Sequence, residues 1–462
     1  MKLMKQPVRG LAAALNSSGK FKFKAPEVAV DHLVIGAGIY YPADSLKTRL
    51  CLRGRDLMYQ RCRALDIPHR KTGKLVVAKD NQRPYIENLH LKALRSQWPP
   101  YSNAIDDSPV LPTRLISGDE SRAMEPNLSQ DISAALWCPE TGIVDSHSFM
   151  ESLEHDISES EVGNLAYATR VVRLDPYRSS KQMSEAERGW VVQTVTGNDE
   201  GSGTESDTIL ARTVFNASGL SGPFILNSLL PPERRIPMYY ARGSYASYQG
   251  PGISGISHLI YPCPDTGPNA HAFASLGTHL TLDLNGKIKF GPDIEFLSPP
   301  SSEDSEENMD YWTRHLIPDD SRLEKMHLAV KQYLPEVVAD GLRPDYVGIR
   351  PKLVPAGAGF QDFVFRIDYP CQFGGGGTVG EGPMISLLGI ESPGLTSCLA
   401  IAEYIWEGPF EYGGSKNAIQ EELEKHDTRA VIVSTTWSHN SNRNKRTHLG
   451  EINPSLTTYT SE

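Results

Sequence analysis

The chain has 462 residues, of which 39% are hydrophobic and 22% charged, so it is neither a small peptide module nor a wholly disordered protein. Its formal net charge of -10 argues against nucleic acid as a partner, because binding to a phosphate backbone needs a basic surface. No apolar run is long enough for a transmembrane helix, which leaves a soluble protein or one associated peripherally with a membrane. The six cysteines form no C-x-x-C pair and no cluster with histidines, so we expect buried thiols and no metal site.

The N-terminal residues are basic and free of acid. Six lysines and arginines precede Glu27, the first acidic residue. In an otherwise acidic chain this composition is typical of a mitochondrial transit peptide, and a basic tail without a targeting role is the alternative. We predict that residues 1–28 are disordered and that the protein is mitochondrial.

The first predicted element is an apolar run, residues 30–35, whose pattern favours a buried parallel strand that enters a tight turn at Gly36 and Gly38. Leucine and methionine then recur at helical spacing from Asp44 or Ser45, either of which can cap the helix, to Ile67-Pro68. A strand is expected at residues 74–78 and a second helix at residues 86–97.

The middle of the chain alternates helix and strand and then becomes sheet-like. A helix should open at Asp145 and run to residue 156, and strands should follow at residues 168–174, 189–196 and 207–217. Residues 238–290 alternate apolar and polar positions between turns such as Asn285-Gly286 and Gly291-Pro292, which predicts an antiparallel sheet. Helical periodicity returns at residues 326–338, and residues 406–462 are predicted to be a disordered extension. This layout favours a nucleotide-binding α/β domain with a sheet-built domain inserted into it.

A strand that runs into G-x-G is the first half of a dinucleotide-binding fingerprint, in which glycines let a pyrophosphate approach backbone N–H groups. Here Tyr41 occupies the third glycine position, and no strand ending in an acid follows at the spacing that holds a ribose. Gly36 and Gly38 are therefore either a simple turn or a pyrophosphate loop. The segment T-V-F-N-A-S-G-L, residues 213–220, is likewise either a strand-end turn or a close approach of backbone to a ligand.

Two later segments carry stronger signals. In residues 386–405 a strand leads to a helix that Ser392 can cap, and the free N–H groups of that helix suit an electron-rich ligand. The buried face of this helix is expected to carry Leu395, Leu399 and Ala402. In G-I-R-P-K-L, residues 348–353, Arg350 precedes a proline at a strand end, where its guanidinium either binds a carboxylate or forms a surface salt bridge.

Eight segments carry a resemblance to a known family. They are G-I-Y-Y-P-A-D-S-L-K-T-R-L-C-L-R-G (38–54), H-R-K-T-G-K-L-V-V-A (69–78), T-G-I-V-D-S-H-S-F (141–149), N-A-S-G (216–219), H-L-I-Y-P-C-P (258–264), L-G-T-H-L-T-L-D (276–283), G-I-R-P-K-L (348–353) and G-I-E-S-P-G-L-T-S (389–397). In sequence and in order they closely resemble the FAD-dependent L-2-hydroxyglutarate dehydrogenases, of the D-amino-acid-oxidase-like flavoprotein superfamily. The resemblance spans about residues 30–405.

The chain departs from this family near its start. Members continue from V-I-G-A-G into a complete G-x-G-x-x-G helix, a second strand with the ribose-binding acid, and a segment ending in H-A-G. Here Gly38 runs straight into the Y-Y-P motif, so most of the first βαβ unit is missing. The resemblance implies a mixed α/β fold: a Rossmann-like FAD-binding domain, incomplete at its N-terminal βαβ unit, with an inserted antiparallel-sheet substrate domain. The FAD-binding domain would comprise residues 29–70, 140–235 and 345–405, and the substrate domain residues 71–139 and 236–344.

The resemblance also implies catalytic roles. Arg350 would hold the substrate carboxylate, and Lys352 would assist with the distal carboxylate. His279 would take the hydroxyl proton while hydride leaves C2 for the flavin, unless it is an ordinary core or surface histidine. Tyr41, with Tyr40, resembles an aromatic pair near the flavin, and ordinary packing at a helix start is the alternative.

For the FAD cofactor, the resemblance assigns four sets of residues. Gly36 and Gly38 resemble a remaining pyrophosphate loop, and Val171 or Val172 the strand that contacts adenine through its backbone. The second crossing of the dinucleotide and the flavin-ring segment correspond to Ala217, Ser218 and Gly219, and to Gly389, Ser392, Gly394, Leu395 and Thr396.

Together these features imply an FAD enzyme that oxidises a small dicarboxylate, L-2-hydroxyglutarate, to 2-oxoglutarate and passes the electrons to an unidentified acceptor. One alternative is an oxidase or dehydrogenase of another small 2-hydroxy or 2-amino acid. The other is a catalytically inactive truncated isoform that cannot bind FAD, because losing a central βαβ unit uncovers sheet edges and apolar faces.

Overall fold

The computed structural model describes residues 32–35, 39–96, 110–160, 163–167, 169–177, 188–196, 205–264, 277–298, 311–379, 381–407 and 430–433. The predictions for residues 1–31, for Gly36 and Gly38, and for most of the stretch after residue 407 lie outside the described residues.

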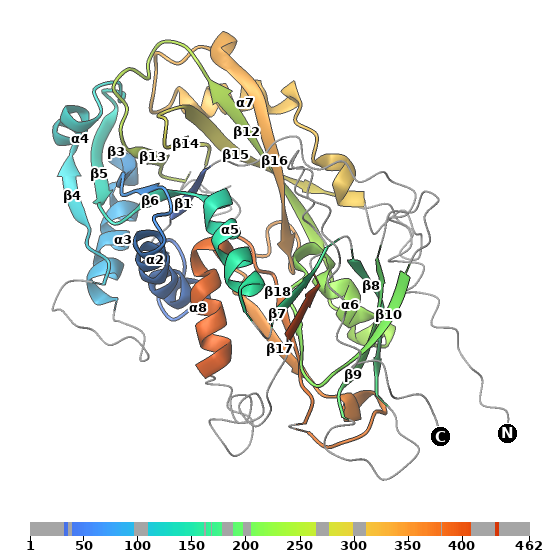
Figure 1. Cartoon of the computed structure of the whole chain (residues 1–462). Coiled ribbons are helices and arrows are strands. Elements are labelled where there is room, and N and C mark those ends of the chain that lie inside the picture. Colours follow the sequence, from blue (N-terminus) through green and yellow to red (C-terminus); the bar gives the residue numbers. More distant parts are fainter. Residues whose placement is uncertain are drawn as a thin grey trace, which may run out of the picture.

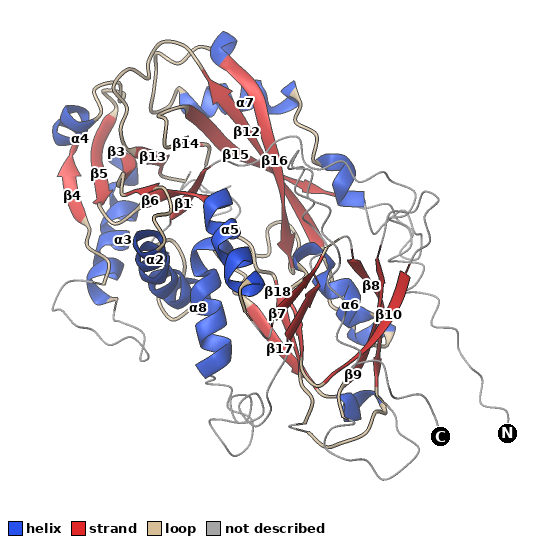
Figure 2. Cartoon of the chain, in the orientation of Figure 1, coloured by secondary structure: helices blue, strands red, loops and turns tan. Residues whose placement is uncertain are grey.

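An eight-stranded sheet forms the upper part of the molecule (Figures 1 and 2). In spatial order its strands are β16 (Leu342–Lys352), β12 (Tyr239–Tyr248), β15 (Ile288–Leu297), β14 (His279–Leu282), β13 (Leu259–Pro262), β3 (Lys74–Lys79), β5 (Ile132–Cys138) and β4 (Arg114–Ser117). Strands β13 and β3 pair in parallel and the other neighbours pair antiparallel. The antiparallel sheet predicted for residues 238–290 is confirmed.

One turn in this sheet was predicted wrongly. Gly291-Pro292 lies inside β15, whereas Asn285-Gly286 does lie in the turn before that strand, with Gly286 at φ 80°. Gly291 pairs with His279 and sits beside an irregularity in β12 between Ser244 and Ala246. A side chain at Gly291 would clash with the Tyr245 ring, so the glycine permits a bulged strand and does not end it.

A hydrophobic core covers one face of the sheet beside α7 (Leu323–Val330). Among its members are Leu75, Val77, Ile260, Leu280, Phe290, Met326, Val330 and Tyr333. Helix α7 begins and ends earlier than the predicted range 326–338, because the chain continues from Val330 in turns that bury Tyr333 and Leu334.

Smaller sheets make up the lower part of the molecule (Figure 2). They are β11 (Val214–Asn216) with β18 (Met384–Leu388) and β17 (Val364–Asp368); β10 (Glu205–Ala211) with β9 (Trp190–Thr196) and β8 (Thr169–Pro176); β1 (His32–Ile35) with β6 (Gly142–Asp145) and β2 (His69–Arg70); and β19 (Ala430–Val433) with β7 (Gly163–Ala166). Strands β11 and β18 are parallel, as a nucleotide-binding domain requires.

Three strand predictions need correction. Strand β1 pairs antiparallel with β6, not in parallel: His32 lies opposite Asp145 and Ile35 opposite Gly142, so the two strands run in opposite directions. The single strand predicted at residues 207–217 is two strands, β10 and β11, which belong to different sheets. Strand β19 lies in the extension predicted to be disordered, and that prediction is wrong for these four residues.

Helix α2 (Leu46–Ala64) confirms the first predicted helix. Its N-cap is Ser45, whose hydroxyl accepts the Thr48 N–H. The next two predicted helices are also present, as α3 (Arg83–Arg95) and α5 (Ser146–Ser158), and Asp145 caps α5.

Helix α8 (Gly394–Glu407) packs beside α2 (Figure 1). The contact is so close that a Cβ atom on Gly54 would overlap the Thr396 carbonyl oxygen. The buried residues of α8 are therefore mostly small: Thr396, Ser397, Ala400, Ile401 and Ile405. The predicted buried face is confirmed in part: Leu395 and Leu399 are partly buried and pack against the core around Met58 and Phe149, whereas Ala402 is exposed.

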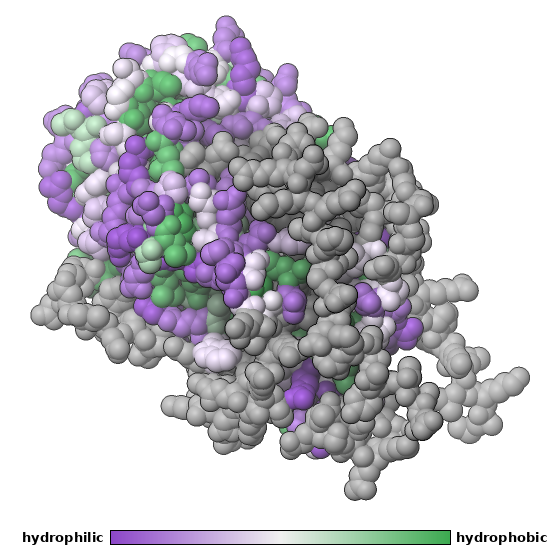
Figure 3. Space-filling model, in the orientation of Figure 1, coloured by the Kyte–Doolittle hydropathy of each residue, from purple (hydrophilic) through white to green (hydrophobic). Residues whose placement is uncertain are grey.

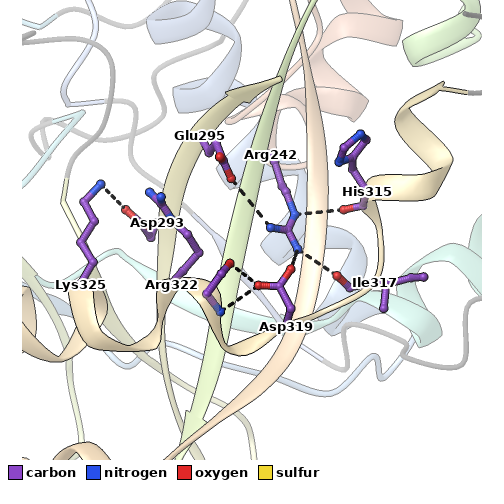
Figure 4. A network of polar contacts seen from close by, with 9 residues as sticks. Arg242, Asp293, Glu295, His315, Ile317, Asp319, Arg322 and Lys325 are labelled. Atoms are coloured by element: carbon purple, nitrogen blue, oxygen red, sulfur yellow. Dashed lines mark hydrogen bonds and ion pairs between the residues drawn. The ribbon is translucent and has the colours of Figure 1, made fainter. Parts of the chain in front are cut away.

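A polar network ties residues 315–325 to the eight-stranded sheet (Figure 4). Arg242 of β12 donates to the carbonyl oxygens of His315 and Ile317 and to Asp319. Asp293 of β15 pairs with Arg322 and Lys325 beside it. Because Arg242 is largely buried, these hydrogen bonds satisfy a charge that would otherwise be costly.

The described surface around the eight-stranded sheet is mostly hydrophilic in Figure 3. No helix in the described part of the chain has the length and apolar character needed to span a bilayer. All six cysteines are free, and the described residues contain no cluster of three potential metal ligands.

Candidate active site

The C-terminal end of β16 meets the loop between β18 and α8 at the carboxylate of Glu391. Lys352 Nζ donates to Glu391 Oε1 at 2.6 Å, and Lys47 Nζ, from α2, donates to the same oxygen at 2.9 Å. Arg350 Nη1 lies 3.9 Å from the other oxygen, Glu391 Oε2. The fold thus joins residues from three distant parts of the sequence into one charged cluster.

This cluster is buried on one side and open on the other. The exposed fractions of the side chains are 3% for Lys47, 4% for Glu391, 15% for Lys352 and 27% for Arg350. Burial would raise the pKa of Glu391, but the charges of Lys47, Lys352 and Arg350 lower it below its usual value. Three cations and one ionised carboxylate leave two net positive charges, which suits an anionic ligand that approaches from the side of Arg350.

Lys47 is held in place by aromatic rings and by its own helix. Its ammonium lies 5.4 Å from the ring centroid of Tyr41 and 5.4 Å from that of Phe363. The Lys47 N–H donates to Asp362, which also accepts from the Leu46 N–H at the start of α2. Burial lowers the pKa of Lys47, and the nearby Glu391 opposes this effect.

Tyr41 joins this cluster to the segment before α8. Its hydroxyl donates to the Ser392 carbonyl oxygen at 3.0 Å, and burial raises its pKa. Lys92 of α3 donates to the carbonyl oxygens of Ile39 and Tyr41 and so anchors the short segment that carries Tyr40 and Tyr41.

His279 lies on β14 near the same cluster, and its imidazole is neutral at neutral pH. Burial, with the positive charges of Arg350 and Lys74, lowers its pKa to about 3. The ring stacks on Tyr261 with 3.9 Å between centroids. Its Nδ1 atom is buried and makes no hydrogen bond of normal geometry with any described residue. A buried, unpaired nitrogen of this kind is free to interact with a ligand.

A buried lysine lies behind His279. Lys74 Nζ is 4.6 Å from the Tyr40 ring centroid and 4.9 Å from that of Tyr261, and these two rings are nearly parallel. Burial lowers the pKa of Lys74. Its position beside aromatic faces supplies part of the stabilisation that a buried ammonium needs.

The segment before α8 supplies backbone close to the cluster. Gly389 has φ 65°, which favours glycine, and follows β18 directly. Helix α8 begins at Gly394, where the Pro393 carbonyl oxygen accepts the Ser397 N–H, so Ser392 precedes the helix and does not cap it. Ser392 is exposed, Leu395 is partly buried and Thr396 is buried against α2.

The other predicted cofactor residues lie on other elements, and the short helix η4 (Gly219–Ser221) contacts β16, the strand that carries Arg350. Ser218 follows β11, and its hydroxyl donates to Asn216 Oδ1 at 2.9 Å. A Cβ atom on Gly219, which has φ 58°, would meet no atom within 4 Å. Val171 and Val172 lie on β8, in a different sheet, at an irregularity of its pairing with β9. Ala217 lies between β11 and Ser218.

Solved structures with the same fold are oxidoreductases. L-alpha-glycerophosphate oxidase from Mycoplasma pneumoniae, whose structure has FAD bound, aligns with a TM-score of 0.57 at 17% identity over 89% of this chain and 95% of that chain. L-proline dehydrogenase from P. horikoshii aligns with a TM-score of 0.53 at 15% identity over 86% of this chain and 90% of that chain. The chain therefore has the mixed α/β fold of these proteins.

A sequence profile described as FAD dependent oxidoreductase, or DAO, matches residues 32–407. The chain belongs to this family, and its cofactor is FAD.

Curated relatives carry one name. The mitochondrial L-2-hydroxyglutarate dehydrogenase of Arabidopsis thaliana is 33% identical over 390 residues, which cover 80% of this chain and 73% of that protein. The mitochondrial enzyme of Homo sapiens is 27% identical over 56% of this chain, and the Escherichia coli K12 enzyme is 28% identical over 56%. The matched region spans about half the length of the human and bacterial relatives, 50% and 52% respectively.

Two described features leave room for a bound group such as FAD: the buried Nδ1 of His279, and the backbone at Gly219, where a Cβ atom would meet nothing within 4 Å. At Gly389 a Cβ atom would instead meet the Leu353 side chain. Gly36 and Gly38, the expected pyrophosphate loop, lie outside the described residues.

Several residues of the cluster escaped sequence reasoning. Lys47, Glu391, Tyr261 and Lys74 were not predicted to take part, although all four stand inside segments that carry the family resemblance. The sequence signal that could have identified them is a charged residue inside an otherwise apolar run. For example, Lys74 begins β3, a strand that is buried from its first residue to its fifth.

Proposed function

We propose that this chain oxidises L-2-hydroxyglutarate to 2-oxoglutarate. The observation that carries the proposal is the net charge of two in the cluster of Lys47, Lys352, Arg350 and Glu391, which complements a dicarboxylate. The relatives named L-2-hydroxyglutarate dehydrogenase support it.

In this proposal each polar residue has one task. Arg350 binds the carboxylate next to C2, because its guanidinium is the most exposed cation of the cluster. Lys352 assists at the distal carboxylate while it remains paired with Glu391. Tyr41 packs at the flavin side through its contact with Ser392.

His279 accepts the proton of the C2 hydroxyl, and bound FAD supplies the two-electron acceptor for the C2 hydride. The O–H and C2–H bonds break and a carbonyl double bond forms. A pKa of about 3 makes His279 a weak base in the ligand-free chain. A bound dicarboxylate offsets the charge of Arg350 and thereby raises the pKa of His279 toward the range that proton transfer requires.

FAD is assigned to Gly389, Ser392, Gly394, Leu395 and Thr396 at its ring, to Ala217, Ser218 and Gly219 at the second crossing, and to Gly36, Gly38, Val171 and Val172 at the adenosine half. Seven strands of the eight-stranded sheet then lie in the substrate domain of residues 71–139 and 236–344, and β16 runs from it into the FAD-binding segment that begins at residue 345. The protein acts in mitochondria, as the names of the plant and human relatives suggest, and passes its electrons to a separate acceptor.

A second candidate is the oxidation of another small 2-hydroxy or 2-amino acid with one carboxylate. The pairing of Lys352 and Lys47 with Glu391 favours it, because Arg350 is then the cation with the greatest freedom to bind a carboxylate.

The test is the visible spectrum of the purified chain with FAD, recorded without oxygen. Bleaching of the flavin bands by L-2-hydroxyglutarate, and not by D-2-hydroxyglutarate or a 2-hydroxymonocarboxylate, supports the first candidate. Bleaching by the monocarboxylate alone supports the second. A chain that stays colourless would show the inactive truncated form instead.

Two variants of the same strand sharpen this test. Arg350→Met should lose bleaching at low substrate concentration, because a carboxylate contact is removed. Arg343→Met, which removes an arginine from the other end of β16, should bleach as the parent chain does.

A further inference from the structure

Glu391 uses its two carboxylate oxygens differently. Oε1 accepts from Lys47 and from Lys352. Oε2 is buried and has no hydrogen-bond partner among the described residues. Arg350 Nη1 lies 3.9 Å from it, which is beyond hydrogen-bond distance.

An unpaired, buried acceptor costs free energy, and an ionised one costs more. Glu391 is ionised at neutral pH because three cations lower its pKa. A ligand that brings a hydrogen-bond donor to Oε2 is therefore favoured, and a ligand that brings an acceptor is disfavoured.

The position of Oε2 selects where on the ligand that donor must be. Arg350 faces the same oxygen and has 27% of its side chain exposed, so a carboxylate bound to its guanidinium lies beside Glu391. In a 2-hydroxy acid the hydroxyl stands on the carbon next to that carboxylate, within reach of Oε2.

We propose that Glu391 Oε2 accepts the hydrogen bond of the C2 hydroxyl when the substrate first binds, before that hydroxyl turns to His279 for proton transfer, and so is a specificity-determining atom of this site. It distinguishes the hydroxyl of the substrate, a donor, from the carbonyl of the product, an acceptor. This inference rests on the proposed function, because it assumes that Arg350 holds the neighbouring carboxylate.

The site should therefore bind the product, 2-oxoglutarate, weakly. Oxidation turns the donor at C2 into an acceptor that faces an ionised oxygen, which promotes release of 2-oxoglutarate. Glutarate, which has no oxygen at C2, avoids this repulsion but leaves Oε2 unpaired. An amide at position 391 keeps the shape of the side chain and offers an N–H donor to the carbonyl.

The experiment measures the dissociation constants of 2-oxoglutarate and glutarate by calorimetry, with the full FAD-loaded chain and no turnover. In the parent chain 2-oxoglutarate should bind about fivefold more weakly than glutarate. In Glu391→Gln the order should reverse, so that the ratio of the two constants changes by about tenfold or more. General damage to the site weakens the binding of both ligands and leaves the ratio of their dissociation constants unchanged.

Glu125→Gln is the matched control. Glu125 is also a buried glutamate with an unpaired Oε2, but its other oxygen holds the backbone of Ser257 and His258. In this variant the ratio of the two dissociation constants should equal that of the parent chain. If Glu391→Gln alone does not fold, the double variant with Lys47→Met removes the ammonium that would be left unpaired and gives the same measurement.

The outcomes separate this inference from the proposed function. If both ligands bind with an unchanged ratio in Glu391→Gln, the role of Oε2 is overturned and the proposed function stands. If neither ligand binds the parent chain, or if Arg350→Met binds both as the parent does, the proposed function fails and this inference with it.

Discussion

Lys47 shows how one residue depends on a partner far away in the sequence. Its side chain is 3% exposed, and its ammonium donates to Glu391, which lies 344 positions later. An ammonium buried to this degree is tolerated only when a carboxylate and suitable contacts accompany it. The stability of the region around Lys47 therefore depends on Glu391.

Glu391→Gln should lower the free energy of unfolding by about 3 kcal/mol, because it leaves the Lys47 charge buried without its carboxylate. Urea unfolding followed by circular dichroism measures this. Adding Lys47→Met should recover at least half of the loss, since the unpaired charge is then gone. The exposed pair Arg83–Glu87 is the control: Glu87→Gln should cost less than about 0.5 kcal/mol. Equal losses in the two single variants would contradict the prediction.

His279 should make stability depend on pH. Its folded pKa is about 3 and the ordinary value is 6.5, so between these values the unfolded chain binds a proton that the folded chain does not. Stability is therefore lost as the pH falls below about 6.5. Relative to His279→Gln, the parent chain should lose about 2 kcal/mol of unfolding free energy between pH 7 and pH 5. A difference that stays constant between these pH values would show that His279 is not held neutral.

At the scale of elements, the contact between α2 and α8 sets where the predicted flavin segment lies. Helix α8 follows that segment directly, and its small buried residues pack on α2 at Gly54. Helix α2 also carries Lys47 near its N-terminus. A change in the spacing of the two helices would therefore move Lys47 relative to Glu391.

Gly54→Ala should separate these helices and lower the free energy of unfolding by about 3 kcal/mol, because the new methyl group overlaps the Thr396 backbone. It should also weaken FAD binding, which fluorescence titration measures. Gly348→Ala on β16 is the control, since a Cβ atom there meets nothing within 4 Å. If the stability of Gly54→Ala equals that of the control, the helices are not in the close contact described.

At the scale of the whole molecule, the strands expected to hold the two halves of FAD differ in how they pair. Strand β1 pairs antiparallel with β6, whereas β11 and β18 keep the parallel pairing of a nucleotide-binding domain. In the proposed assignment the flavin end lies at the segment before α8, the second crossing at the residues after β11, and the adenosine end at β8.

Thermal unfolding with FAD and with FMN, which lacks the adenosine half, separates these contributions. At a hundredfold excess over its dissociation constant, FAD should stabilise the fold by about 2.7 kcal/mol. At equal concentration FMN should stabilise it less, because FMN lacks the adenosine half that the proposed function assigns to Val171 and Val172. Equal stabilisation by FAD and FMN would mean that these residues do not bind the adenosine half.

Local patterns in the sequence were sufficient for the elements that local forces determine. The Ser45 cap and leucine spacing predicted α2, Asp145 predicted the start of α5, and alternation predicted the antiparallel sheet. The family was evident from motif order and is confirmed by the profile match over residues 32–407. These properties depend on a few neighbouring residues, or on runs of sequence that are read directly.

Only the tertiary structure decided which distant residues meet. The pairing of Lys47 and Lys352 with Glu391 depends on how α2, β16 and the loop before α8 pack together. The buried face of α8 depends on a glycine in another helix, and the antiparallel pairing of β1 depends on β6 being its neighbour. Periodicity reports which side of an element is apolar, but not which partner covers it, because the partner is chosen by packing over the whole chain.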